Sequence, residues 1–120
     1  MEVRGIRGAT TVDSNTEQDL KEATVELINK MIEENNIKLE DIAFAQFSTT
    51  KDLDCAFPAK FARLECNFVN VPMMSSNEQE VKNSLQMALR ILLVVNTDKK
   101  QNEIKHQYLK GAKVLRPDIK

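Results

Sequence analysis

The segment Leu89-Arg90-Ile91-Leu92-Leu93-Val94-Val95-Asn96-Thr97 decides the fold of this chain. It contains an uninterrupted aliphatic run over 91–95, which is typical of a β-strand buried on both faces. By the alternation of a strand, Arg90 shares a face with Leu92 and Val94. Such an arginine either reaches solvent at the strand end or points as a cation into a pocket. The pattern alone leaves both interpretations open.

Around this strand the sequence predicts an α+β fold with a mixed sheet. Further extended segments are predicted at 3–12, 41–49, 67–71 and 108–115. Helices are predicted at about 16–35 and at 58–65, with a helical turn at 101–106. The long helix has an apolar stripe at helical spacing, and Ser14 with Glu17 has the spacing of a capping box. Pro58 is suited to the first position of the short helix.

This inventory gives four or five strands and one long helix. A single helix covers only one face of a sheet, whereas the 91–95 run needs both faces dry. The simplest missing cover is another subunit, so we expect a homo-oligomer.

Composition narrows the class of protein. The 120 residues predict one domain spanning 1–120, and a formal charge of −1 argues against a general nucleic-acid binder. No apolar run approaches a membrane span, and residues 1–5 do not resemble a signal peptide. Cys55 and Cys66 fit no zinc or disulfide pattern. The sequence has one histidine, which argues against a histidine-based metal site or a catalytic triad. We therefore expect a cytoplasmic protein without metal or cofactor.

Arginine is scarce in the chain, so each arginine at a structured position is a candidate for binding an anion. Arg7 lies between Gly5 and Gly8, where a ligand would reach the backbone, although an exposed strand charge is an equal alternative. For the other candidates, pattern alone favours a role without ligand binding. Lys60 and Arg63 fit a solvated helix face, and Arg116 fits a solvated tail. Glu78 fits a solvated polar loop over 75–80, and Phe57 fits a packing residue. Tyr108 is either a core residue or a hydroxyl donor, and His106 has no evident partner. Pattern alone therefore predicts an oligomer with arginines suited to a small polyanion.

Several motifs carry a resemblance beyond this pattern. They are Arg4-Gly5-Ile6-Arg7-Gly8-Ala9-Thr10-Thr11-Val12, Phe57-Pro58-Ala59-Lys60 with Arg63, Val71-Pro72, Glu78, Arg90, Thr97-Asp98 and Val114-Leu115-Arg116-Pro117-Asp118. Together they span essentially the whole chain and resemble the monofunctional AroH-type chorismate mutases. The opening nonapeptide is the most specific of them.

The resemblance implies a mixed sheet packed on one long helix, three such subunits forming a homotrimer with a barrel-like centre, and active sites between neighbouring subunits. The implied reaction converts chorismate to prephenate, a step of aromatic amino-acid biosynthesis. This [3,3] rearrangement is intramolecular and needs no nucleophile, proton transfer, metal or cofactor. Catalysis then requires a folded substrate and a cation at the ether oxygen as its bond breaks.

The resemblance also implies roles for individual residues. Arg90 would contact the ether oxygen and a carboxylate, Glu78 would accept from the ring hydroxyl, and Arg7 with Tyr108 would hold the enolpyruvyl carboxylate. The remaining implied substrate-binding residues are Phe57, Ala59, Lys60, Arg63, Met74, Ser75, Leu115 and Arg116. Phe57 would come from across the subunit boundary, and Leu115 with Arg116 would help to close the site.

Two positions depart from the family pattern. Ser75 stands where cysteine is common, and its hydroxyl can still donate a hydrogen bond. Met74 stands where threonine is common and lacks the side-chain hydroxyl. These changes bear on affinity and positioning more than on the reaction.

Two other functions compete with this interpretation. A non-catalytic or deaminase-type trimer of related fold would also bind small ligands between subunits, but the set of Arg7, Glu78 and Arg90 argues against it. An RNA-binding module is disfavoured by the charge balance and by having only six Phe and Tyr residues.

Overall fold

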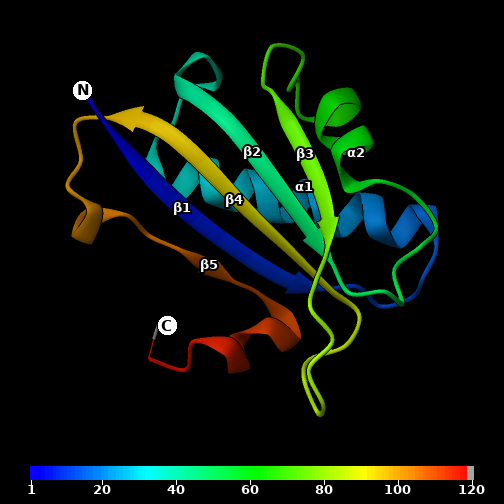
Figure 1. Ribbon diagram of the computed structural model, residues 1–120. Coiled ribbons are helices and arrows are strands. Elements are labelled where there is room, and N and C mark those ends of the chain that lie inside the picture. Colours follow the sequence, from blue (N-terminus) through cyan, green and yellow to red (C-terminus); the bar gives the residue numbers. More distant parts are fainter. Residues whose placement is uncertain (119–120) are drawn as a thin grey trace.

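The computed structural model describes residues 1–118, so the last two residues of the predicted domain lie outside the described part. Its elements are β1 (Glu2–Thr11), α1 (Glu17–Asn35), η1 (Leu39–Asp41), β2 (Ile42–Thr49), α2 (Pro58–Glu65), β3 (Met73–Asn77), β4 (Ala88–Thr97), η2 (Gln101–Glu103), β5 (Gln107–Tyr108) and η3 (Lys110–Leu115), where η marks a 3-10 helix. The strands form one sheet in the order β3-β2-β4-β1-β5 (Figure 1). The central strand β4 runs antiparallel to β1 and β2, whereas the outer pairs β2–β3 and β1–β5 are parallel. The predicted mixed sheet is confirmed.

The two faces of β4 have different surroundings. Ile91, Leu93 and Val95 are almost fully buried in the core on the side of α1, which crosses behind the sheet in Figure 1. On the other face Leu92 is 37% exposed and Val94 is half-buried. One helix therefore covers one face, as predicted, and a single chain leaves the opposite face open.

Close packing fixes the distance between β1 and α1. A Cβ added to Gly8 would collide with the Met31 sulfur and stand 3.0 Å from Leu27 Cδ1. Gly8 therefore lets the helix approach the strand, which explains one of the two glycines in that segment. On the other face of β1, a Cβ at Gly5 would meet only Leu92 Cδ1, at an ordinary 3.6 Å.

The N-cap of the long helix lies two residues after Ser14, the N-cap of the predicted capping box. Thr16 is the N-cap, and its hydroxyl accepts from the Asp19 amide. Ser14 instead donates to the Asp19 carboxylate at 2.5 Å. The pairing of Ser14 with Glu17 is therefore wrong, because a second hydroxyl residue nearer the helix takes the capping position.

The strand predicted at 67–71 is also wrong. Asn67 adopts φ 59°, which breaks an extended run, and the amide of the buried Phe68 donates to Ala62 O at the end of α2. The buried Phe68 and Val71 thus belong to a packed turn, whereas Val69 is exposed. The strand begins after Pro72, so that residues 75–77 of the predicted polar loop belong to β3.

The C-terminal region is less extended than predicted. Only Gln107 and Tyr108 form a strand, and residues 110–115 form the 3-10 helix η3. Lys110 has φ 50°, and the Gly111 amide donates to Thr11 Oγ1 at 3.1 Å. This bend turns the chain so that the buried Ala112 packs on Tyr108. Of the helical turn predicted at 101–106, only 101–103 is helical.

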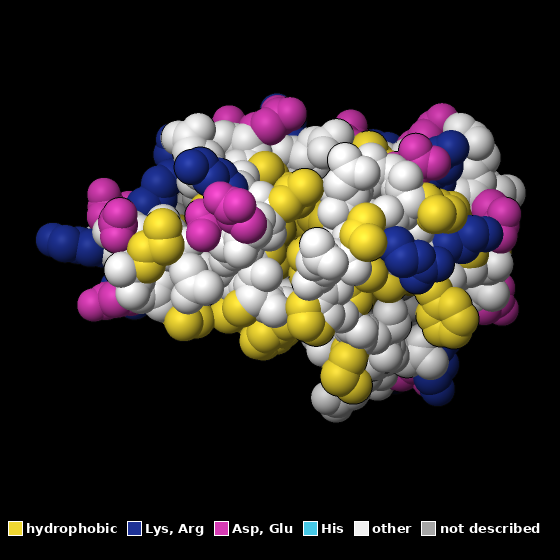
Figure 2. Space-filling model, turned by 90° about the horizontal axis from the view of Figure 1, so that it is seen from above, with side chains coloured by type: hydrophobic (Ala, Val, Ile, Leu, Met, Phe, Trp, Pro, Cys, Tyr) yellow, Lys and Arg dark blue, Asp and Glu magenta, His cyan; other side chains and the backbone are white. Residues whose placement is uncertain are grey.

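Several large apolar side chains are exposed on the single chain. They include Val3, Phe44, Phe57, Met74 and Leu92. Figure 2 shows hydrophobic side chains gathered through the middle of the face seen from above, with most charged groups towards its margins. Across residues 1–118, no helix has both the length and the apolar character that a membrane span requires.

Candidate active site

One row of residues runs across all five strands on the open face of the sheet. The backbone register places Ser48 and Ala9 on either side of Arg90, with Ser76 beyond Ser48 and Tyr108 beyond Ala9. Because this register is fixed by the sheet, Arg90 on the central strand is held between groups that are far apart in sequence.

Arg90 is the centre of the site. Its side chain is only 15% exposed, and its Nη1 lies 2.5 Å from Oε2 of Glu78, just after the end of β3. Ser48 Oγ donates to the same Glu78 oxygen at 3.0 Å. The hydrogen bond from Arg90, supported by that from Ser48, holds the pKa of Glu78 below its usual value of 4.5. Glu78 is therefore an ionised acceptor at neutral pH.

The guanidinium retains a donor that no described residue uses. Nε of Arg90 is buried and has no hydrogen-bond partner within residues 1–118. Burying an unpaired donor costs about 1–3 kcal/mol, so such groups are rare outside functional sites. Of the two interpretations left open by sequence, the cation aimed into a pocket is the one that fits.

A hollow of about 290 Å³ lies against the Arg90 side chain. It is lined by Arg7, Gln46, Ser48, Glu78, Arg90, Ile91 and Leu92. Arg7 pairs with Leu92 in the sheet, one step along the open face from Arg90. The three residues that the resemblance marks as catalytic are thus brought together, with two cations and one carboxylate facing a single small space.

Tyr108 lies beside Ala9 at the end of this row of residues. It is 8% exposed and packs with Ala9, Ala112, Leu85 and Leu115. Arg116 lies close enough for its charge to interact with the Tyr108 hydroxyl, and its guanidinium also binds Asp118 at 2.9 and 3.0 Å. The structure therefore joins Tyr108, Leu115 and Arg116 into one group next to Arg7.

The remaining predicted residues stand apart from this group. Phe57 is 72% exposed rather than packed, and with Ser75 it lines a different cavity of about 470 Å³ beside α2. Lys60 contacts Glu17 at 3.5 Å, Arg63 is exposed on α2, and Ala59 packs against the edge of the core. Met74 pairs with Gln46 on β2 and is 70% exposed. Within one subunit, none of Phe57, Ala59, Lys60 and Arg63 lines the hollow at Arg90.

Sequence reasoning missed three residues near the site. Gln46 and Ser48 line the hollow, and their alternation with buried Ala45 and Phe47 was a usable signal for a polar face. His106 has a partner after all, since its Nδ1 accepts from the Arg7 amide at 2.9 Å. Only the register of β5 reveals that contact. Residues 1–118 contain no group of three or more His, Cys, Asp or Glu side chains placed to hold a metal.

Comparisons with known proteins agree with this geometry. The family model described as chorismate mutase type I matches residues 3–119. The chain belongs to this family. The predicted family and the predicted enzyme class, an isomerase, are thereby confirmed.

Individual relatives match over nearly their full lengths. Chorismate mutase AroH of Bacillus subtilis is 42% identical, over 99% of this chain and 94% of that protein. Chorismate mutase AroH of Thermus thermophilus is 44% identical, over 98% and 96% respectively. A solved chorismate mutase from Clostridium thermocellum superposes with a TM-score of 0.89 at 44% identity, covering 92% of this chain and 97% of that one.

Proposed function

We propose that this chain converts chorismate to prephenate by holding the substrate folded and by placing the Arg90 guanidinium against the ether oxygen. The observation that carries the proposal is the unpaired, buried Arg90 Nε beside a second cation, Arg7. Chorismate is a dianion, and its rearrangement moves electrons towards the ether oxygen as the C–O bond breaks. A fixed donor binds that oxygen more tightly in the transition state than in the ground state, because the oxygen gains negative charge. This difference in binding lowers the barrier.

Glu78 both orients Arg90 and binds the substrate. Its carboxylate orients the guanidinium at 2.5 Å, and because its pKa is lowered it stays ionised to accept from the ring hydroxyl. Arg7 and Tyr108 then bind the enolpyruvyl carboxylate on the far side of Arg90. This division of contacts fits the order of residues across the sheet, with Glu78 beyond β2 and Tyr108 on β5.

The site is completed by a second subunit in a homotrimer. Phe57, Ala59, Lys60 and Arg63 do not reach the hollow of their own chain, and the open sheet face exposes Leu92. A neighbouring copy that covers this face would bury its apolar residues and bring its own α2 to the mouth of the site. In such a trimer Ser75 and Met74 would lie near the subunit boundary, and we expect their departures from the family pattern to affect affinity rather than bond rearrangement.

The proposed chemistry requires no cofactor, because every bond that forms or breaks lies within the substrate. We place the reaction in the cytoplasm, where Cys55 and Cys66, both free thiols, would stay reduced. A non-catalytic ligand-binding trimer is the alternative, and turnover of chorismate distinguishes the two.

The direct test is prephenate formation by the purified chain, with its mass measured by sedimentation. We expect activity and a mass three times that of the chain. A monomer that rearranges chorismate no faster than buffer would refute the proposal. Mixing the variants Arg90→Ala and Arg63→Ala, each of which we expect to lose activity alone, tests the shared site. Hybrid trimers recover activity if the two residues come from different subunits, whereas no recovery would place both in one subunit.

A further inference from the structure

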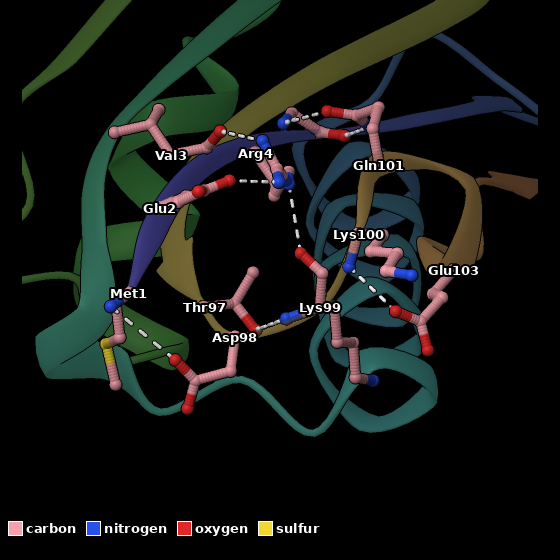
Figure 3. Close-up of polar contacts among 11 residues, drawn as sticks. Met1, Glu2, Val3, Arg4, Thr97, Asp98, Lys99, Lys100, Gln101 and Glu103 are labelled. Atoms are coloured by element: carbon pink, nitrogen blue, oxygen red, sulfur yellow. Dashed lines mark hydrogen bonds and ion pairs between the residues drawn. The ribbon is translucent and has the colours of Figure 1, made fainter.

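The free edge of β1 is closed by a series of contacts from the C-terminal part of the chain. Gln101 binds Gly5 through its side chain, with Oε1 accepting from the Gly5 amide at 3.3 Å and Nε2 donating to Gly5 O at 2.9 Å (Figure 3). Two residues along β1, the Arg7 amide donates to His106 Nδ1 at 2.9 Å. Two residues further, Ala9 O accepts from the Leu109 amide at 2.9 Å. Side chains thus replace the partner strand where β5 is absent.

The segment carrying His106 is itself anchored to the core. Asn35, at the end of α1, is fully buried and binds both backbone groups of Lys105, at 2.9 Å to the carbonyl and 2.7 Å from the amide. On the other side of His106, Gln107 and Tyr108 pair with Gly8 and Ala9. His106 is therefore held from both ends and has little freedom to leave the Arg7 amide.

The contact requires a neutral imidazole with its proton on Nε2, because Nδ1 is the acceptor. The charged groups that act on His106 are Arg116, on the segment after η3, and Arg7, on β1. Burial, followed by these two cations, lowers the pKa of His106 below its usual 6.5. Nδ1 is thus free to accept at neutral pH.

We propose that His106 is a positioning residue for the Arg7 cation: by accepting the Arg7 amide it fixes the part of β1 from which the Arg7 side chain enters the site. The inference rests on the proposed function. Arg7 binds a substrate carboxylate that persists through the reaction, so a misplaced Arg7 weakens the ground state and the transition state equally. Such a loss raises KM and leaves kcat nearly unchanged.

The chain offers a matched control for this test. His106→Leu removes the acceptor at Arg7, and Gln101→Leu removes equivalent contacts at Gly5, which carries no site group. We expect His106→Leu to raise KM for chorismate by roughly three- to ten-fold, the value of one hydrogen bond, and Gln101→Leu to leave KM unchanged. His106→Asn keeps an acceptor near the position of Nδ1 and restores KM.

Two further measurements separate positioning from general stabilisation. In the wild type, KM rises as pH falls through the pKa of His106, whereas in His106→Asn this rise is absent. Because the chain has a single histidine, the imidazole ¹⁵N spectrum of the wild type reports its tautomer without assignment and without any variant. We expect the Nε2–H form.

The outcomes distinguish this inference from the proposed function. An active wild type whose KM is unmoved by His106→Leu, or moved equally by Gln101→Leu, would overturn the inference alone, as would an Nδ1–H tautomer. A wild type that forms no prephenate would overturn the proposed function and this inference with it.

Discussion

Replacing Arg90 with lysine tests the proposed mechanism most sharply, because it keeps the charge and removes only the planar fork. In the structure one guanidinium nitrogen is engaged by Glu78 at 2.5 Å, while Nε is unpaired and buried. A lysine ammonium has all its donors on one nitrogen. It pairs with Glu78 but does not also place a second, separate donor at the ether oxygen.

The expected fall in kcat follows from the loss of one hydrogen-bond donor at the ether oxygen. A donor aimed at charge that develops in the transition state contributes about 2.7–4 kcal/mol, so kcat for prephenate formation falls by roughly 10²–10³. Arg90→Ala loses at least as much. In Arg90→Lys the folded state is affected far less, because the ammonium keeps the ion pair with Glu78, whose side chain is 32% exposed.

Arg4→Lys is the matched control. Arg4 uses its fork structurally, with Nε donating to Lys99 O at 2.9 Å, Nη1 to Val3 O at 3.3 Å, and Nη2 bound to Glu2 (Figure 3). Arg4→Lys also removes guanidinium hydrogen bonds, but near the start of β1 and away from the hollow at Arg90. We therefore expect lower stability and a kcat within about two-fold of wild type. The assay is the initial rate of prephenate formation, alongside thermal unfolding. If Arg90→Lys keeps most of its turnover, or if Arg4→Lys loses as much, the reasoning is refuted.

Three other outcomes are expected. Glu78→Gln lowers kcat/KM by roughly ten- to a hundred-fold, because a charged acceptor is lost, and a near-normal value would remove Glu78 from the mechanism. The pKa of Glu78 is lowered, so the carboxylate is fully ionised at neutral pH and protonates only below its usual 4.5. The plot of kcat against pH should therefore be flat near neutrality. A fall in kcat on either side between pH 6 and 8 would indicate acid–base catalysis. Gly8→Ala destabilises the fold by about 1–3 kcal/mol in thermal unfolding through its clash with Met31 and Leu27, whereas Gly5→Ala is tolerated, and equal effects would contradict the packing argument.

Local patterns in the sequence were sufficient for most of the elements. The aliphatic run of β4 and the stripe of α1 predicted their elements closely, because burial on one side of a strand or helix imposes a period that is visible in sequence. The failures were at segments where tertiary contacts override this period. Phe68 and Val71 in the segment 67–71 are buried in a turn after α2, and residues 110–115 are bent by a contact with Thr11.

The sequence by itself determined the family and the reaction, and it predicted the main site residues, because the motifs that carry them are contiguous or lie on regular elements. The tertiary structure decided which of these residues meet. Register across β2, β4, β1 and β5 places Ser48, Arg90 and Tyr108 in one row, leaves the Arg90 Nε unpaired, and sets His106 on the Arg7 amide. Pairing between distant strands depends on how the whole sheet packs against α1, and no local period of the sequence encodes that choice.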